Sequence, residues 1–427
     1  MHNNHTLIII QAKIELSFKK CYILDFMEEK VEPIAKGTVT SPRGFLAGAT
    51  EAGVKYMGRL DLGILFSEKP SISAAVFTGN KVKAAPIMIS MKHQEVGRAR
   101  AVVVNSGCAN ACTGDKGRAD AEEMARAAAS KLDIAPEEVL VASTGVIGVP
   151  LPVDRIKAAI PKIKLSRAGG HKLARAIMTT DTHSKEIALR VTDNTGHYII
   201  SGIAKGAGMI HPNMATLLSF LSTDARVSPE FLQKALKTAV DMSFNMITID
   251  GDTSTNDMVS IIANGAADNV LVNERNGRIF QVALDQVCKY LACSIAGDGE
   301  GATKLIEIEV TGARNRTDAR KAVRTIAGSM LVKAAIYGND PNWGRIVAAL
   351  GRSGASFDDQ RLDIFLQDIQ VMKQGNPVPY EKHRLSKQLK NDTVYIKLCL
   401  NLAKASAIGW GCDLSQEYVT INSDYTT

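Results

Sequence analysis

Two kinds of hydrophobic periodicity alternate along this chain, and the mixture limits the folds that it can adopt. Residues 305–310 place Ile306, Ile308 and Val310 opposite glutamates, and residues 394–400 alternate in the same way. Such period-two patterns predict strands with one exposed face. Half-polar strands joined by hairpins or long segments favour mixed or antiparallel α/β layers over a doubly wound parallel sheet. The chain is therefore expected to be an α/β protein of the α+β type.

Segments of helical composition separate these strands. Ser228 followed by Pro229 is a typical N-cap and first helical residue, so a helix is predicted from there to about Phe244. The remaining predicted elements are helices at 120–132, 153–163 and 317–336, and strands at 101–105, 139–142 and 418–422.

Composition bounds the classes of function. The 427 residues are 45% hydrophobic and 22% charged, which is typical of a soluble globular protein with two or three domains. Aromatic residues make up only 5%, so a nucleic-acid platform of stacking rings is not expected. The net charge of +7 is spread along the chain, which fits an ordinary solvated surface or attraction of acidic metabolites.

Cysteine usage and hydropathy bear on compartment and ligands. The seven cysteines are an odd number without a CxxC pair or a Cys/His cluster, so no metal site is predicted, and reduced thiols in the cytoplasm are expected. The sequence has no run of about 18 apolar residues, so neither a transmembrane helix nor a membrane partner is predicted.

Residues 205–216, Lys-Gly-Ala-Gly-Met-Ile-His-Pro-Asn-Met-Ala-Thr, carry the strongest sign of chemistry. Their glycines permit a tight backbone path, and the small Ala215 precedes the hydroxyl of Thr216. A threonine hydroxyl needs a neighbouring base. Cleavage before Thr216 would free an α-amine, titrating near pH ~8, that can act as this base. The alternative is a glycine turn that begins a buried strand or helix.

The same stretch resembles the self-cleavage motif of the glutamate N-acetyltransferase/ornithine acetyltransferase family of arginine biosynthesis. The resemblance continues in family order over about residues 43–427. It leaves residues 1–30 as an uncertain N-terminal extension, in which Met27 resembles a natural start and residues 1–26 could be a tail, an extra strand or a mis-set translation start. Other segments that carry the resemblance lie at 105–114, 143–148, 177–182, 250–257, 297–304, 340–346 and 421–427.

The resemblance implies an αββα sandwich of the self-cleaving, N-terminal-nucleophile-like kind, in which two mixed sheets lie face to face with helices outside. It also implies cleavage between Ala215 and Thr216 into an alpha chain, residues 31–215, and a beta chain, residues 216–427. Both chains would share one catalytic core, with a smaller lobe in the beta chain. Two of each would form a heterotetramer.

The resemblance further implies a ping-pong transfer of acetyl from N2-acetyl-L-ornithine to L-glutamate through acetyl-Thr216. Thr144 and Gly145 would form the oxyanion hole that stabilises negative charge on the reacting carbonyl oxygen; the alternative is an ordinary Thr-Gly turn. Both substrates are small molecules. No cofactor is expected, and acetyl-CoA is left open as a second donor.

The same resemblance assigns contacts to the substrates. Lys205 would hold the α-carboxylate that both substrates carry, Glu300 an ammonium group, and Thr179 the substrate backbone. Asn422 and Thr427 match further contacts at the end of the chain. Each has an ordinary alternative: a solvated lysine, a turn carboxylate, a turn cap or a mobile terminus.

Other motifs compete for parts of this chain. Residues 247–253 resemble the strand-DxDxT motif of haloacid-dehalogenase phosphatases, but that motif usually opens the catalytic domain and here it lies mid-chain. The same aspartates could suggest calcium, but the glycine and glutamate of an EF-hand loop are missing at the required offsets. Residues 297–304 are glycine-rich without the P-loop pattern. His211 is interpreted as a surface or loop histidine rather than a base. Cys108 stands where the family has asparagine and is interpreted as a small buried thiol.

Two other functions remain open on the sequence. An N-terminal-nucleophile hydrolase, such as a β-peptide aminopeptidase, would release ornithine to water alone, whereas a transferase would need glutamate. A non-catalytic binding protein would stay intact and bind acetylornithine without turnover.

Overall fold

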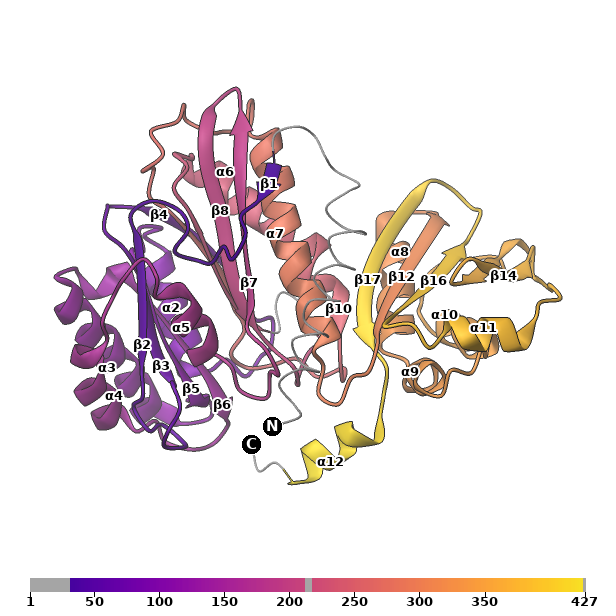
Figure 1. Ribbon diagram of the computed structural model, residues 1–427, viewed down its shortest axis with the longest axis horizontal. Helices are drawn as coiled ribbons and strands as arrows, with labels where there is room; N and C mark the ends of the chain where they lie inside the picture. The colour runs from indigo at the N-terminus through magenta and orange to yellow at the C-terminus, as the bar shows by residue number, and fades with distance from the viewer. Residues whose placement is uncertain (1–30, 212–216, 425–427) are drawn as a thin grey trace.

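The computed structural model describes residues 31–211 and 217–424, and its larger part is built on two facing sheets (Figure 1). The sheets enclose one buried cluster that includes Val104 and Leu140 from one sheet and Phe220 from the other. The four-stranded sheet runs β2 (Phe45–Thr50), β3 (Leu62–Ser67), β5 (Ala101–Cys108), β6 (Val139–Val146). The six-stranded sheet runs β1 (Val31–Pro33), β7 (Lys185–Asp193), β8 (Gly196–Lys205), β9 (Leu218–Thr223), β11 (Met258–Ala263), β4 (Ile72–Phe77).

Both sheets are mixed, and helices cover their outer faces. β5 pairs parallel with β6, and β9 pairs parallel with β11, whereas the other pairs are antiparallel. These layers confirm the expected αββα sandwich. The outer helices are α6 (Pro229–Met242) and α7 (Arg278–Gly297) on the larger sheet, and α2 (Ala85–Gln94) and α3 (Gly114–Leu132) on the smaller, with α4 (Val153–Ala159) beside α3. Helix α5 (Gly170–Ala176) lies between the sheets instead, because it contacts β2, β3, β7 and β8 and its Leu173 belongs to the cluster that both sheets enclose.

A third sheet forms a separate lobe, drawn in orange and yellow at the right of Figure 1. The pairing of Ile247 with Trp410 joins the lobe to the main sandwich. Its strands run β10 (Ile247–Thr248), β17 (Ala405–Cys412), β12 (Leu305–Ala313), β16 (Thr393–Cys399), β13 (Asp363–Leu366), β14 (Ile369–Lys373), β15 (Asn376–Pro377). Its helices are α8 (Arg316–Ala327), α9 (Met330–Tyr337), α10 (Trp343–Gly351) and α11 (Lys382–Gln388).

Local sequence signals set most of these boundaries. The Ser228 hydroxyl accepts a hydrogen bond from the Phe231 amide at 3.4 Å, so the predicted start of α6 is confirmed. The single helix predicted over 317–336 is wrong, because the chain forms α8 and α9 with Gly328 and Ser329 between them. The Asn315 side chain caps the first of these helices by accepting from the Asp318 amide at 2.8 Å.

The predicted strand at 418–422 is also wrong, because these residues lie in helix α12 (Gln416–Asp424). None of the residues of this helix is buried, and no strand pairs with it in the described part of the chain. Its side chains bond along the helix, as Asn422 does to the Tyr418 carbonyl at 2.9 Å. The β-branched Val419, Thr420 and Ile421 suggested a strand, but such residues favour strands chiefly where a sheet surface buries them.

Helix α7 is long and apolar enough, by length and composition, to cross a membrane. Its packing explains that composition, because the helix lies against the larger sheet and most of its apolar length is buried there. A Cβ added to Gly202 on β8 would come within 3.0 Å of Leu291, so the glycine lets helix and sheet approach closely. The helix therefore has the character of a core helix.

Candidate active site

All the predicted site residues that the structure describes line one cavity of about 180 Å³, here called the Thr144 cavity. Ile210 and Leu217 also line it, so the cavity borders both described ends of the segment that contains Ala215 and Thr216. Those two residues, and Thr427, lie outside the described residues. The predicted residues that meet in the cavity are Thr144, Gly145, Thr179, Lys205, Glu300 and Asn422.

Strand β6 carries Thr144 and Gly145 to the cavity wall, a little before its end at Val146. Gly145 has φ +131°, and an added Cβ would lie 2.3 Å from the Gly107 carbonyl carbon on β5. Only glycine fits this approach without displacing the neighbouring strand. The Asn256 side chain donates from Nδ2 to the Ser143 carbonyl at 2.9 Å, which fixes the backbone next to Thr144.

Lys205, the last residue of β8, points its ammonium group at two threonines. Nζ donates to Thr179 Oγ1 at 2.8 Å and approaches Thr144 Oγ1 at 3.4 Å. The residue is only 7% exposed, so it is not the solvated lysine of the alternative interpretation. Burial lowers the pKa of Lys205, and the negative charges of Asp181, Asp257 and Glu300 partly oppose that shift.

A buried ionic network holds this wall in place. Lys185 Nζ lies 2.7 Å from Asp181 Oδ1 and 2.6 Å from Asp298 Oδ2. Asp181 also accepts from the amides of Thr179 and Gly206, so one carboxylate ties together the two segments that carry Thr179 and Lys205. Burial alone would raise the pKa of Asp181, but Lys185 and Lys205 outweigh it and hold that pKa below its usual range.

Glu300 and Asn422 form the opposite wall. Asn422 Nδ2 donates to Glu300 Oε2 at 2.8 Å, and the Glu300 amide donates to the Ala207 carbonyl at 2.9 Å. A Cβ on Gly208 would lie 2.5 Å from Glu300 Oε1, so that glycine leaves room for the carboxylate. The half-buried Glu300 side chain is thus oriented at the cavity rather than free in a turn.

Asp257 lines the cavity as well, although no role was predicted for it. It is 2% exposed, and its Oδ2 has no hydrogen-bond partner among the described residues. Burial raises the pKa of Asp257 well above its usual value. Two sequence signals could have found it: it ends the segment 250–257 that carries the family resemblance, and it lies immediately before the buried strand β11.

Two other residues of the sequence motifs, His211 and Asp250, form hydrogen bonds that hold the backbone beside the cavity. The half-buried His211 shares a hydrogen bond between Nδ1 and Thr248 Oγ1 at 2.9 Å, and burial together with Arg324 lowers its pKa to about 4. Asp250 accepts from the Met209 and Ile210 amides, at 2.5 and 2.8 Å, and so shapes the backbone beside the cavity.

Cys108 is the small buried thiol that was expected. It is 3% exposed, and burial raises the pKa of its thiol. Across residues 31–211 and 217–424, no group of three or more His, Cys, Asp or Glu side chains is arranged to hold a metal ion.

A small polar cavity lined by hydroxyls, a buried lysine and carboxyl groups is typical of an enzyme that acts on a small polar molecule. The ArgJ family model matches residues 46–427. The chain is 54% identical over 405 residues to the arginine biosynthesis bifunctional protein ArgJ of Dehalococcoides mccartyi (strain CBDB1), covering 94% of this chain and 100% of that protein.

Two further proteins are similar to all or part of this chain. The arginine biosynthesis bifunctional protein ArgJ of Symbiobacterium thermophilum is 50% identical over 397 residues, covering 92% of this chain and 99% of that protein. A solved ornithine acetyltransferase from Mycobacterium tuberculosis, complexed with ornithine, is 42% identical, with a TM-score of 0.41 over 43% of this chain and 100% of that chain.

The chain belongs to the ArgJ family. This confirms the family expected from the sequence motifs, and with it the enzyme class: the protein is an acyltransferase, a glutamate N-acetyltransferase.

Proposed function

We propose that this enzyme transfers acetyl from N2-acetyl-L-ornithine to L-glutamate, giving L-ornithine and N-acetyl-L-glutamate, through an ester on Thr216. One observation carries the proposal: Thr144, Lys205 and Glu300, which are far apart in sequence, line a single cavity together with Leu217, the residue after Thr216. The arginine biosynthesis function of the family members supports the choice of substrates.

The first half-reaction uses two groups of Thr216, its free α-amine and its hydroxyl. The free α-amine of Thr216 takes the proton from its own hydroxyl, and Oγ attacks the acetyl carbonyl of acetylornithine. Thr144 and the backbone N–H of Gly145 stabilise the oxyanion, and a donor of this kind is worth about 3–4 kcal/mol. The intermediate collapses by breaking the amide bond, the α-amine of ornithine leaves with a proton, and acetyl stays on Oγ.

The second half-reaction runs the same steps with glutamate. Its neutral α-amine attacks the ester carbonyl, the same donors hold the oxyanion, and the Thr216 hydroxyl is restored as N-acetylglutamate leaves. Both substrates carry an α-carboxylate, so Lys205 serves both halves as the cationic partner. Glu300, with Asn422 beside it, receives the side-chain ammonium group of ornithine, and Thr179 contacts the substrate backbone.

The free amine requires that the bond between Ala215 and Thr216 be cut. We include in the proposal that the Thr216 hydroxyl attacks the Ala215 carbonyl and that water opens the resulting ester. The products are an alpha chain ending at 215, preceded by the uncertain extension 1–30, and a beta chain at 216–427. Strands from both sides of the cut form the six-stranded sheet, so the two chains stay associated.

Three further expectations belong to this proposal. Two alpha and two beta chains assemble into a heterotetramer, the enzyme works in the cytoplasm, and acetyl-CoA serves as a second acetyl donor without any resident cofactor. The bifunctional naming of the family members supports the last of these.

The competing function is hydrolysis, in which water rather than glutamate takes the acetyl group. The deciding experiment follows ornithine release from acetylornithine with and without glutamate. Transfer predicts a single stoichiometric burst without glutamate and steady turnover with it. Steady turnover without glutamate, at an unchanged rate, would show a hydrolase instead.

A further inference from the structure

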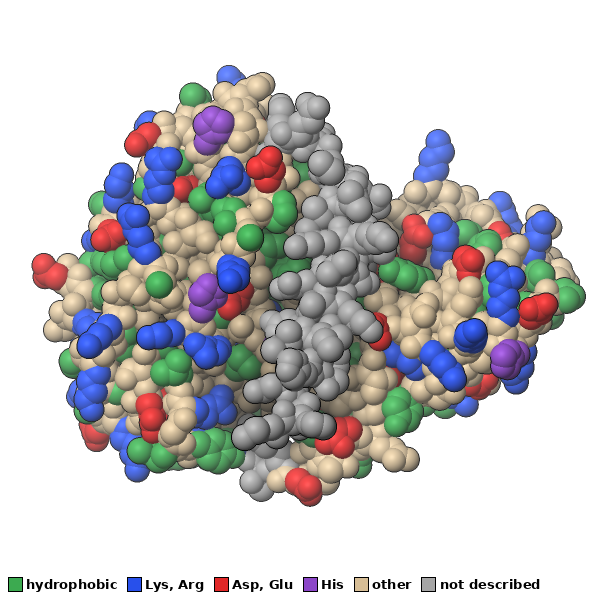
Figure 2. Space-filling model, in the orientation of Figure 1, with side chains coloured by type: hydrophobic (Ala, Val, Ile, Leu, Met, Phe, Trp, Pro, Cys, Tyr) green, Lys and Arg blue, Asp and Glu red, His purple; other side chains and the backbone are tan. Residues whose placement is uncertain are grey.

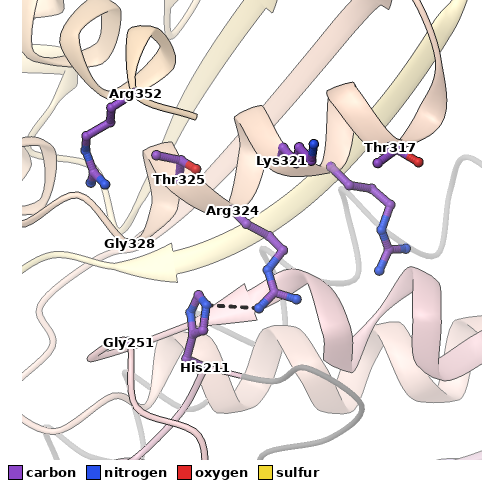
Figure 3. Close-up of a pocket in the computed structure, with 9 residues that line it drawn as sticks. His211, Gly251, Thr317, Lys321, Arg324, Thr325, Gly328 and Arg352 are labelled. Atoms are coloured by element: carbon purple, nitrogen blue, oxygen red, sulfur yellow. Dashed lines mark hydrogen bonds between the residues drawn. The ribbon is translucent and has the colours of Figure 1, made fainter. Parts of the chain in front are cut away.

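A second cavity, of about 530 Å³, lies on the other side of the backbone that borders the Thr144 cavity. Ile210 lines the Thr144 cavity, and the next residue, His211, lines this one. Figure 3 shows the second cavity between helix α8 and the segment that carries His211. The acetyl transfer proposed above uses none of the residues that line it.

Positive charge dominates this second cavity, here called the basic cavity. Arg320, Lys321, Arg324 and Arg352 line it, and among the described residues no carboxylate does. None of these four forms an ion pair with any residue in the described ranges. On the face drawn in Figure 2, lysines and arginines are scattered with carboxylates among them. Four cations around one hollow, with only Asp241 acting on Arg320 from nearby and no ion pair formed in the described part of the chain, are therefore a distinctive arrangement.

The fold holds two of the guanidinium groups rigidly. Arg320 Nη1 donates to the Asp241 carbonyl at 2.5 Å, and Arg324 Nη1 donates to the Asn245 carbonyl at 3.0 Å. Arg324 Nη2 also donates to His211 Nε2 at 3.0 Å, the contact drawn in Figure 3. Burial lowers the pKa of both groups, yet arginine stays protonated at neutral pH.

Helix α8 presents the remaining groups on the same side. Thr317, Lys321 and Thr325 recur every four residues, so they face the cavity as one row. Lys321 and Arg352 are exposed, whereas Arg320 and Arg324 are half-buried. Guanidinium groups that the fold orients, together with two exposed cations and the threonine hydroxyls, suit the several oxygens of a phosphate.

We propose that the basic cavity binds a ligand carrying two or more phosphate groups. Its volume lies within the usual range for small-molecule sites, and four cations exceed what one carboxylate or one phosphate would neutralise. Two sources share this chemistry: the coenzyme A portion of an acyl donor, and a free nucleotide or pyrophosphate. The coenzyme source rests on the proposed function, whereas phosphate binding itself does not.

The test measures binding by calorimetry on the purified full-length protein, so it does not depend on transfer activity. The probes are inorganic pyrophosphate, ATP and coenzyme A, each with wild type and with the double variant Lys321→Gln/Arg352→Gln. These two residues form no side-chain hydrogen bond within the described chain, so their loss should leave the melting temperature of the free protein unchanged. The matched control is Arg384→Gln/Lys387→Gln, an exposed pair on α11.

We expect micromolar-range binding of at least one probe to wild type, weakened about tenfold or more in the double variant and unchanged in the control, because each lost charge-assisted contact is worth about a factor of ten or more. Coenzyme A binding tighter than pyrophosphate and ATP identifies the coenzyme source, and the reverse order identifies a free nucleotide or pyrophosphate. Absence of binding by all three probes, or equal weakening in the control, overturns the proposal. Should the double variant melt early, Arg352→Gln alone provides the same comparison.

Discussion

Lys205 in the Thr144 cavity and Arg324 in the basic cavity are both partly withdrawn from water, but their electrostatic settings are opposite. Lys205 lies near Asp181, Asp257 and Glu300, and their charges offset part of the cost of burial. Arg324 lies near another cation, Arg320, which adds to the effect of burial. A compensated cation such as Lys205 suits one small carboxylate, whereas Arg324, whose pKa is affected by a neighbouring cation and by no carboxylate, suits an added polyanion.

The cavities also differ in what fixes them. Buried carboxylates and close backbone contacts hold the Thr144 cavity, as Gly145 against β5 illustrates. The basic cavity is open, and half of its cations stand on exposed side chains. Substitutions in the first should therefore damage chemistry or folding, whereas substitutions at the rim of the second should change only ligand affinity.

The largest expected effect comes from Thr216→Ala, which removes the proposed nucleophile. Transfer should fall about 10⁴-fold or more, because the loss of a nucleophile leaves only binding and oxyanion stabilisation. The same variant should run as one intact chain on a denaturing gel. Thr192→Ala, a change at an exposed threonine on β7, should cleave and turn over normally. A cleaved, active Thr216→Ala protein would rule out this residue as nucleophile.

Asp181→Asn tests the network that supports the Thr144 cavity. The substitution leaves the buried Lys185 with one carboxylate, so the free energy of unfolding should fall by about 3 kcal/mol or more in chemical denaturation. Glu123→Gln breaks an ion pair with Lys157 on the exposed surface and serves as the control, with little expected change. Equal effects of the two substitutions would show that the buried network does not stabilise the site.

Thr144→Ala separates the oxyanion role from substrate binding. The variant should lose about 10²-fold in kcat with little change in KM, since the donor acts mainly on charge in the transition state. Thr144→Ser keeps a hydroxyl and should recover most of the rate. If KM rises and kcat holds, Thr144 is a binding residue instead.

The smallest effect concerns pH. Because the pKa of Lys205 is lowered from 10.5, its charge is lost as pH rises, at a lower pH than for a free lysine. KM for glutamate should therefore rise on the alkaline side, by about tenfold once the cation is neutral, from the loss of one charge-assisted bond. Lys205→Arg keeps its charge, so its KM should stay flat over the same range. A wild-type KM that is equally flat would contradict the assignment.

Local patterns in the sequence predicted much of the fold. The Ser228–Pro229 helix start and the alternating strands β12 and β16 depend on neighbouring residues, so they could be recognised without a structure. The strand prediction at 418–422 was wrong because β-branched residues form a strand only where a sheet edge is available to pair with them. The break between α8 and α9 at Gly328 and Ser329 was not predicted, because apolar residues continue on both sides of it.

The candidate site was predicted mainly from family motifs rather than from physics. Composition could not show that Lys205 is buried, because burial depends on how β8 meets β6 and the Thr179 loop. The Lys185 to Asp298 pair spans 113 residues, so no local pattern joins the two. The basic cavity was missed for the same reason, since Arg352 comes to α8 through the packing of α10.

The most direct test of the central claim is a mass measurement of the purified enzyme after incubation with acetylornithine and no glutamate. The account predicts two chains, with the second beginning at Thr216 and carrying one acetyl group on its hydroxyl that disappears when glutamate is added. An active enzyme whose chain is uncut before Thr216, or whose acetyl group lies elsewhere and still passes to glutamate, would contradict it.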